Sequence, residues 1–570
     1  MQRAAFSPLR AAAAALPRSR RAAPSSSSSS SSFSSSSSSS SSSPAYDFVI
    51  AGAGVTALAS ARYLARAAPS ARILLVTPHA PMSQTSSLST ECYRDHWPSA
   101  GMRAFMQRSI ALIDAHAAEQ DAFRVTRHGY LYCSKEAAAP AAFAAEAREC
   151  HGASEVRVMR SAAEAAALGR APWSSRAPRA MGADVFTTAG AALAAFPYLS
   201  GELSAAMHTR NCGWVSAQTM GMDMLDALLA RRGADGAPLT TLARGRVVGA
   251  DLAPGGHSIA AVHVEALADP DAAAAAAAAA PRRRTVTCGA FVNAAGPFLK
   301  QTHAAVLGAA GAAAPGGAAA SDLPVSCEVH AKVVFRDVLN VIPRDAPQAI
   351  LIDRAAPRWL PEELEHVAET VSREAADRAQ SLMGGGAHFR PYGGEESNAV
   401  LMLWEAWHHG VEPSEPPPEA ADQYLDRAMY PDVALRGLAQ LVPGLAAYFD
   451  EGERAALARA RGGGAELPEA KEPYVDGGYY TKTLENHPLV GPMPGPGGKG
   501  RLDNGFVCGA VSGYGIMASH AAGELCAAHA VGASLPSYAE LMSPLRYQSD
   551  AFMKKGGVRD QLLAAGGGQL

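Results

Sequence analysis

The stretch YDFVIAGAGVTA, residues 46–57, decides the fold of this chain. Its apolar run up to Gly52 is typical of a buried strand, and the residues after Gly54 have the composition of a helix. A second apolar run, residues 72–76, follows that helix, so the G-x-G-x-x-A pattern lies within a βαβ unit. Gly52 permits a tight turn, and Gly54 lets the backbone approach an anion at the helix N-terminus. The stretch therefore predicts a dinucleotide-binding domain.

One residue of the dinucleotide pattern is missing. A carboxylate about 20 residues after the glycines usually binds the ribose hydroxyls, but Thr77 stands at the end of the second strand. A neutral hydroxyl forms a weaker hydrogen bond than a carboxylate does. A glycine-rich turn in an α/β protein that binds no nucleotide remains the alternative.

Composition and charge exclude several classes of protein. The 570 residues have a formal net charge of -3, and residues 1–44 contribute five arginines with no acid or lysine. The rest of the chain is therefore more acidic still, which makes nucleic acid an unsuitable partner. The eight cysteines show no CxxC and no paired Cys/His spacing, so we expect reduced thiols and no metal site.

Residues 1–44 have the composition of a transit peptide, with arginine, alanine and serine. Arg3 and Arg10 lie in a segment that can form a basic amphipathic helix, which favours a mitochondrion over a chloroplast. An untargeted tail is the alternative, and the serine tract is expected to be a disordered spacer. No uninterrupted apolar stretch outside alanine-rich low complexity is long enough to span a bilayer, so we expect no transmembrane segment.

Further strands follow the βαβ unit. Residues 123–135 predict a hairpin with Gly129 near its turn. Alternating segments within 241–297 predict a small antiparallel sheet. From residue 323 on, four or five strands with polar turns predict a second sheet.

Two polar or glycine-rich segments are candidates for anion binding. The stretch SQTSSLSTECYRDHWP, residues 83–98, follows the second strand, and its amides and hydroxyls can close over a phosphate. A plain serine-rich loop is the alternative. The turn at residues 512–515, SGYG, begins a helix near the C-terminus and exposes backbone amides.

Four stretches, in matching order and spacing, resemble the FAD-dependent oxidoreductases of the D-amino-acid oxidase, glycine oxidase and sarcosine oxidase family: VIAGAGVTALASARYLA, FVNAAGPF, GGYYTKTLENHPLVGP and GFVCGAVSGYGIMASHAAGELCA. The resemblance covers residues 46 to about 545. It implies an α/β (α+β) fold with a discontinuous Rossmann-like FAD-binding domain and an antiparallel-sheet substrate domain. The FAD-binding domain would comprise 45–120, 213–310 and 485–545, and the substrate domain 121–212 and 321–484, with 1–44 as leader and spacer and 546–570 as tail.

The resemblance implies FAD as a non-covalent cofactor. Gly478 stands at the position where sarcosine oxidases carry the cysteine that tethers FAD, so a covalent link is not expected. Backbone amides of the SGYG turn would face the pyrimidine edge of the flavin, where reduction places negative charge. The residues implied to contact FAD are Gly52, Ala53, Gly54, Val55, Thr77, Ser86, Ser87, Ser89, Val247, Ala295, Gly296, Gly513, Tyr514, Gly515 and Ile516.

For the substrate, the resemblance implies a cationic anchor. Arg390 in HFRPYGG matches the strand position where amino-acid-oxidising members bind the carboxylate through an arginine. Arg94 lies in the region where sarcosine oxidases have a substrate-side arginine, and His388 and Lys332 lie on neighbouring strands. A structural role is the alternative for each of the four side chains.

These observations lead us to expect an FAD enzyme that oxidises the C–N bond of a small amino acid or secondary amine. Hydride would pass to flavin N5 and leave an imine, with oxygen or a protein or quinone carrier as electron acceptor. The resemblance implies a lysine that helps oxygen react on the helix after the SGYG turn, but this sequence has Met517 there. The absence of that cation favours a dehydrogenase or a slow oxidase.

Two alternatives to this function remain open. The stretch TSSLSTECYRDHWP is similar to mitochondrial family members that assist the assembly of respiratory complex I. An FAD-binding organellar assembly factor with little or no amine turnover is therefore the first alternative. The second is a nicotinamide dehydrogenase that uses the same G-x-G-x-x-A, which would be colourless because nicotinamide does not absorb visible light.

Overall fold

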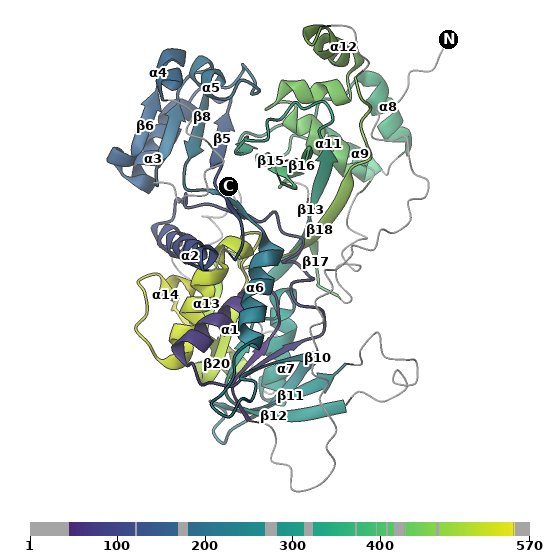
Figure 1. The fold of residues 1–570 in the computed structure, drawn as a ribbon. Coiled ribbons are helices and arrows are strands. Elements are labelled where there is room, and N and C mark those ends of the chain that lie inside the picture. The colour runs from purple at the N-terminus through teal and green to yellow at the C-terminus, as the bar shows by residue number, and fades with distance from the viewer. Residues whose placement is uncertain are drawn as a thin grey trace.

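The computed structural model describes residues 45–119, 122–168, 181–267, 282–312, 323–370, 373–394, 396–405, 408–414, 427, 429–462, 467–550 and 552. The expected leader, residues 1–44, and most of the tail lie outside this range. The described residues form a seven-stranded sheet, a ten-stranded sheet and a small three-stranded sheet. In Figure 1 the seven-stranded sheet lies in the lower half of the molecule and the ten-stranded sheet in the upper half.

The seven-stranded sheet is built around the βαβ unit that the sequence predicts. β1 (Ala45–Ala51) and β2 (Ile73–Thr77) pair in parallel, and α1 (Val55–Ala67) connects them. On its other side β1 pairs in parallel with β12 (Arg282–Asn293), which in turn pairs in parallel with β20 (Arg501–Gly509). Three distant parts of the chain thus complete one parallel core, as expected for a discontinuous Rossmann-like domain.

The antiparallel strands predicted within 241–297 belong to this same sheet. The first half of β10 (Thr240–Leu252) pairs in parallel with β2, and its second half pairs antiparallel with β11 (Ile259–Ala266). β11 also pairs antiparallel with β12, and β19 (Leu489–Pro494) closes the other edge against β20. The strand order is β1-β2-β10-β11-β12-β20-β19, with β1 also next to β12.

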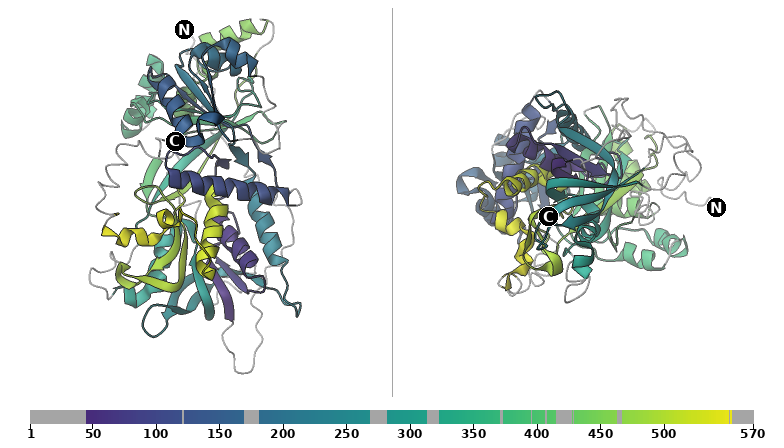
Figure 2. Two further views of the ribbon diagram at one scale, coloured as in Figure 1. Left: turned by 90° about the vertical axis from the view of Figure 1, so that its left-hand side faces the viewer. Right: turned by 90° about the horizontal axis from the view of Figure 1, so that it is seen from below.

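Helices cover both faces of the parallel core. α1, α2 (Ala100–Ala118), α6 (Ala217–Leu229) and α13 (Gly515–Val531) pack on one face with Phe48 and Ile50, and α7 (Leu299–Ala312) packs on the other with Val49. α1 and α13 cross closely because Gly523 has no side chain: a Cβ there would lie 2.5 Å from the carbonyl carbon of Ala59. Figure 2 shows α2 lying across the molecule between its two halves.

The ten-stranded sheet has the order β17-β13-β16-β15-β14-β5-β8-β7-β6, and β18 also pairs with β13. Most neighbours are antiparallel, as predicted, but β5 with β14 and β6 with β7 are parallel. The strand bounds are β5 Tyr130–Ser134, β6 Val156–Met159, β7 Ala183–Phe186, β8 Ala205–Thr209, β13 Ser326–Arg336, β14 Gln348–Leu351, β15 Ala387–Tyr392, β16 Ala399–Trp404, β17 His408–Val411 and β18 Tyr474–Lys482.

The hairpin predicted at residues 123–135 is wrong. β4 (Val125–Thr126) pairs with β9 (Gly213–Val215), which also pairs with β3 (Cys92–Tyr93), whereas β5 joins the ten-stranded sheet. Gly129, at a φ of +82°, turns the chain from one sheet into the other. Alternation identified the two strands, but their partners are remote in sequence.

The described residues also form eight further α-helices. They are α3 Ala139–His151, α4 Ala162–Ala167, α5 Ala189–Ala195, α8 Pro361–Thr370, α9 Arg373–Gln380, α11 Tyr430–Leu438, α12 Glu451–Ala460 and α14 Ala539–Met542. α3 to α5 lie beside β6 to β8, and α11 packs on β15 and β16. Among the described residues, none of the helices combines the length and apolar character needed to cross a bilayer.

Candidate active site

A cavity of about 630 Å³ lies between the seven-stranded and ten-stranded sheets. Its walls are the β1–α1 turn, the end of β2, the loop at residues 83–89, part of β10, the segment after β12, the middle of β18 and the turn before α13. Thirteen of the fifteen residues predicted to contact the cofactor line it: Gly52, Ala53, Gly54, Val55, Thr77, Ser86, Ser89, Val247, Ala295, Gly296, Gly513, Gly515 and Ile516. No described Asp or Glu lines the cavity, whereas Arg246 does, so its walls suit an anionic ligand.

The β1–α1 turn has the geometry that an anion at a helix N-terminus needs. Gly52 adopts a φ of +117°, and a Cβ there would lie 2.3 Å from the carbonyl oxygen of Ala294. Gly54 is the N-cap of α1 and has no side chain to bind the first amides. The amide of Val55 instead donates to Ser86 Oγ over 3.1 Å. Ser86 therefore already lies where the helix N-terminus attracts oxygen atoms.

The hydroxyls of three predicted contact residues bind backbone groups of the protein itself. The Thr77 hydroxyl donates to the carbonyl of His79 (3.0 Å) and accepts from the His79 amide (3.3 Å), so it stabilises its own turn. Ser87 lines neither cavity, and its hydroxyl donates to the carbonyl of Gln84 (2.9 Å). The ring of Tyr514 lines the second cavity described below, and its hydroxyl donates to the carbonyl of Asn486.

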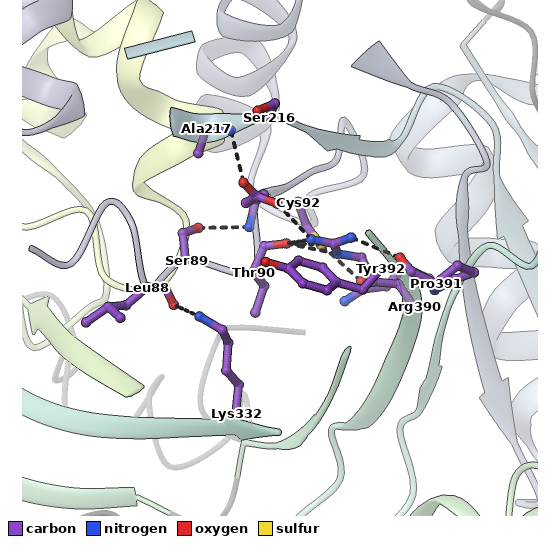
Figure 3. A network of polar contacts seen from close by, with 12 residues as sticks. Leu88, Ser89, Thr90, Cys92, Ser216, Ala217, Lys332, Arg390, Pro391 and Tyr392 are labelled. Atoms are coloured by element: carbon purple, nitrogen blue, oxygen red, sulfur yellow. Dashed lines mark hydrogen bonds and ion pairs between the residues drawn. The ribbon is translucent and has the colours of Figure 1, made fainter. Parts of the chain in front are cut away.

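Two buried cations bind the backbone of the segment 83–92, which we call the serine loop (Figure 3). Lys332 Nζ donates to the Leu88 carbonyl (2.5 Å) and forms an ion pair with Asp476 (2.8 Å). Arg390 donates from Nε and from one terminal nitrogen to the Thr90 carbonyl (3.0 and 2.7 Å). Both cations extend from strands of the ten-stranded sheet, so they tie the serine loop to that sheet.

Glu91 connects the same loop to the other half of the molecule. Its Oε2 accepts from Arg390 (3.1 Å), and its Oε1 accepts from the amide of Ala217 (3.1 Å) at the start of α6. Ser216, the N-cap of α6, does not bind this helix terminus through its own side chain, so Glu91 supplies the negative charge there. Glu91 has a φ of +65°, a strained conformation for a residue with a side chain.

The positions of Arg390 and Lys332 differ from the sequence-based prediction. Neither side chain lines the large cavity or the pocket beside it, and the guanidinium of Arg390 is 1% exposed with Trp214 and Tyr392 stacked against it. The sequence pattern singles out Arg390 but does not say which oxygen atom it binds. In this structure that oxygen atom belongs to the protein's own loop.

A second, smaller pocket of about 50 Å³ adjoins the large cavity, because Tyr480 and Gly513 line both. Two residues predicted for the substrate, Arg94 and His388, line this pocket. The guanidinium of Arg94 lies 4.4 Å from the Trp97 ring centroid and donates to the Tyr132 hydroxyl over 3.5 Å. The full lining is Thr90, Cys92, Arg94, Tyr130, Gln348, Ile350, His388, Glu405, Tyr480, Gly513, Tyr514 and Met517.

His388 is oriented by its backbone neighbour. Its Nδ1 lies 2.7 Å from the carbonyl oxygen of Gly386, which can only accept, so Nδ1 carries the proton and Nε2 the lone pair. Nε2 lies 4.0 Å from Glu405 Oε1. Burial lowers the pKa of His388, and the Glu405 carboxylate offsets this only in part. The imidazole is therefore neutral at pH 7 and can accept a proton at Nε2.

Sequence analysis missed Glu405, Gln348, Cys92 and Tyr480 as lining residues of this pocket. Cys92 donates to Gln348 Oε1 (3.0 Å), and burial raises the pKa of its thiol, so it is not a thiolate. Glu405 directly follows a strand of six apolar residues, AVLMLW, and an acid at the end of such a strand is a signal that could have identified it.

Comparison with known proteins gives one family match. The family model described as FAD dependent oxidoreductase matches residues 47–529. No curated protein sequence matches the chain.

Solved structures share the fold at low sequence identity. L-proline dehydrogenase from P. horikoshii is 15% identical, with a TM-score of 0.54 over 89% of this chain and 98% of that one. Glycine oxidase from Geobacillus kaustophilus is 16% identical, with a TM-score of 0.54 over 88% and 99%. The L-alpha-glycerophosphate oxidase from Mycoplasma pneumoniae, solved with FAD bound, is 10% identical, with a TM-score of 0.51 over 85% and 95%.

Proposed function

Since the chain belongs to the family of FAD-dependent oxidoreductases, we propose that it oxidises the C–N bond of a small amino acid or secondary amine. The observation that carries this proposal is the small pocket beside the large cavity, in which a buried arginine, Arg94, and a neutral imidazole, His388, face one space. A carboxylate can bind the first group, and an amine can release a proton to the second.

FAD is the cofactor of this family, and the large cavity suits it. The amides at the N-terminus of α1 and the hydroxyl of Ser86 would bind the pyrophosphate, and the amides at Gly513 and Gly515 would face the flavin. Bound FAD supplies the hydride acceptor. We propose a non-covalent complex, because Gly478 offers no nucleophile beside the serine loop.

The protein's own residues would prepare the substrate. Arg94 would orient its carboxylate, and His388 Nε2 would accept one proton from its ammonium group, because only a neutral amine can release a hydride from the α-carbon. Tyr480 and Gly513, which line both cavities, would bring the substrate next to the flavin. The electrons would then leave to oxygen or to a protein or quinone carrier.

The test is an anaerobic visible spectrum of the FAD-loaded protein, titrated with small amino acids and N-methyl amines. Bleaching of the flavin bands by one of these compounds is the expected result, and readmitted air then distinguishes an oxidase from a dehydrogenase. A flavin that stays oxidised through the whole panel would contradict the proposal. A protein that binds nicotinamide dinucleotide and no flavin would support a nicotinamide dehydrogenase.

A prediction about pH follows from His388. The pKa of His388 is lowered from the ordinary value of 6.5, and the imidazole must be unprotonated to act as the base. The rate of flavin reduction should therefore stay constant as the pH falls to 6.5. Below the lowered pKa it should fall about tenfold per pH unit. His388→Gln should reduce the rate by about 100-fold and remove this acid limb. Stopped-flow reduction between pH 5 and 9 measures both. An unchanged acid limb in the variant would assign the titration to another group.

A second candidate function is an FAD-binding organellar assembly factor with little or no amine turnover. Arg390 and Lys332 favour it, because both cations bind the serine loop and not the pocket. Cells that lack the protein can be complemented with the His388→Gln variant. Full restoration of respiratory complex I by a variant without amine turnover would support the assembly factor over the enzyme.

We also propose that residues 1–44 direct the protein to the mitochondrion, with the chloroplast as the alternative, on the evidence of their arginine-rich, acid-free composition. A fluorescent protein fused to this segment tests the proposal by its location in the cell. Fluorescence throughout the cytosol would contradict it.

A further inference from the structure

Glu405 is an acid buried in the pocket that the sequence did not identify. It follows β16 directly, and its carboxylate lines the pocket together with Arg94 and His388. Its side chain is 18% exposed, so most of the carboxylate is withdrawn from solvent. Buried carboxylates are rare without a partner, so its neighbours decide its charge.

A chain of alternating charges leads from Lys482, whose side chain is 19% exposed, to Glu405. Lys482 Nζ lies 2.6 Å from Glu328 Oε2, which lies 2.8 Å from His330 Nε2. His330 Nδ1 lies 3.1 Å from Glu405 Oε2. The His330 ring also stacks on Tyr480, with centroids 4.0 Å apart and an interplanar angle of 11°. Every member therefore has a fixed neighbour of opposite charge.

The charges of this chain follow from its contacts. Burial would lower the pKa of His330, but hydrogen bonds to Glu328 and Glu405 outweigh it and raise the pKa. Burial would raise the pKa of Glu405, but the hydrogen bond and charge of His330 lower it to about 2. Glu405 is therefore ionised at pH 7. Its Oε2 lies next to His330, its Oε1 lies 4.0 Å from His388 Nε2, and both His388 and Glu405 line the pocket.

The pocket thus has a cation, Arg94, and an anion, Glu405, around a space of about 50 Å³ that opens to the larger cavity. We infer that the Glu405 carboxylate binds the positively charged nitrogen of the substrate, so that the site selects a small zwitterionic or cationic amine over an alcohol or an acid of the same shape. This inference rests on the proposed function for the identity of the pocket. It goes further by naming the group that distinguishes nitrogen from oxygen and carbon.

The selection has a physical basis. An ammonium group in the pocket would form a charge-assisted hydrogen bond with Glu405 Oε1. A methyl group at the same place would leave the carboxylate desolvated without a new partner, and a hydroxyl would provide only a neutral donor. His388 Nε2, 4.0 Å from the same oxygen, then lies within reach of the proton that the ammonium must lose.

The test uses three ligands of one shape: 2-aminoisobutyrate, 2-hydroxyisobutyrate and pivalate. They differ only in the ammonium, hydroxyl or methyl group, and none has a hydrogen on the α-carbon, so binding is measured without oxidation. Perturbation of the flavin bands of the FAD-loaded protein reports binding. We expect the wild-type protein to bind 2-aminoisobutyrate at least tenfold more tightly than pivalate. The Glu405→Gln variant should reduce this preference to about twofold or less.

The ratio of the two affinities separates recognition from structural damage. A variant with a distorted pocket would weaken all three ligands together, whereas loss of charge recognition weakens only the amine. Glu405→Asp should restore part of the preference, and Glu451→Gln, an exposed residue on α12, serves as the control with an unchanged preference. Any of three results would overturn the inference. The wild-type protein could show no preference for the amine, the Glu405→Gln variant could retain the preference, or the protein could bind none of the three ligands.

Failure of this inference is distinguishable from failure of the proposed function. If Glu405→Gln oxidises amines with unchanged KM, the oxidation of amines stands and the role of Glu405 falls. If the preference for the amine depends on Glu405 but no amine bleaches the flavin, the role of Glu405 in binding is supported and the proposed amine oxidation is contradicted.

Discussion

Gly52→Ala is expected to abolish stable FAD binding and to destabilise the protein even without its cofactor. The backbone of Gly52 has a φ of +117°, which residues with a Cβ rarely adopt, and the new methyl group would lie 2.3 Å from the Ala294 carbonyl oxygen. Gly52 and Ala294 directly follow Ala51 and Asn293, the last residues that pair between β1 and β12, so a shift of either residue would strain the end of that pairing. We expect a loss of about 3 kcal/mol of folding stability and at least about 100-fold weaker FAD binding.

Gly54→Ala is the matched control for this variant. Gly54 has an ordinary φ of -79°, and its Cβ would meet only the Ser86 hydroxyl, at 3.2 Å. The melting temperature of the protein without FAD should therefore stay within about 2 °C of the wild type, while FAD binds more weakly because the methyl group lies beside the pyrophosphate site. Differential scanning fluorimetry and FAD titration separate the two effects. Equal melting temperatures for Gly52→Ala and wild type would show that the turn tolerates a side chain.

Arg390→Ala is expected to release the serine loop from the ten-stranded sheet and to weaken FAD binding about 30-fold. The arginine supplies two hydrogen bonds to the Thr90 carbonyl and one to Glu91 Oε2, and its removal leaves these partly buried oxygen atoms without this donor. Loss of a buried charged hydrogen-bond partner costs about 2 kcal/mol, which corresponds to about 30-fold in affinity if the loop must be closed to hold FAD. Fluorescence of free FAD during dialysis measures the dissociation constant.

Arg436→Ala provides a comparison for Arg390→Ala. Arg436 is equally buried and ion-paired with Glu363 over 2.6 Å, but it lies between Trp359 and Phe449, away from the loop. It should lower the melting temperature and leave the FAD dissociation constant within about twofold. If Arg390→Ala instead leaves FAD binding intact and raises the KM for an amino acid, our expectation for Arg390 is wrong. Arg390 would then be the substrate anchor that the sequence suggests.

The sequence was sufficient for the cofactor domain because its signals are local. The βαβ unit, the alternating strands within 241–297 and the SGYG turn each depend on residues close together in the chain, where glycine conformation and strand alternation follow from the residues themselves. Thirteen of fifteen predicted contact residues line one cavity for the same reason. Ser87 and Tyr514 are the exceptions, since the direction of a side chain in a loop depends on its surroundings.

The substrate side shows what only the tertiary structure decided. An arginine or histidine in a strand stands out against apolar neighbours, so the sequence could name candidate residues for this side. Whether Arg390 or Arg94 faces the pocket depends on segments 300 residues apart in sequence, as the contact of Arg390 with Thr90 illustrates. Glu405 became part of the site only when β13, β15 and β16 were brought together, because sheet register, which sequence specifies weakly over such distances, places His330 and His388 beside it.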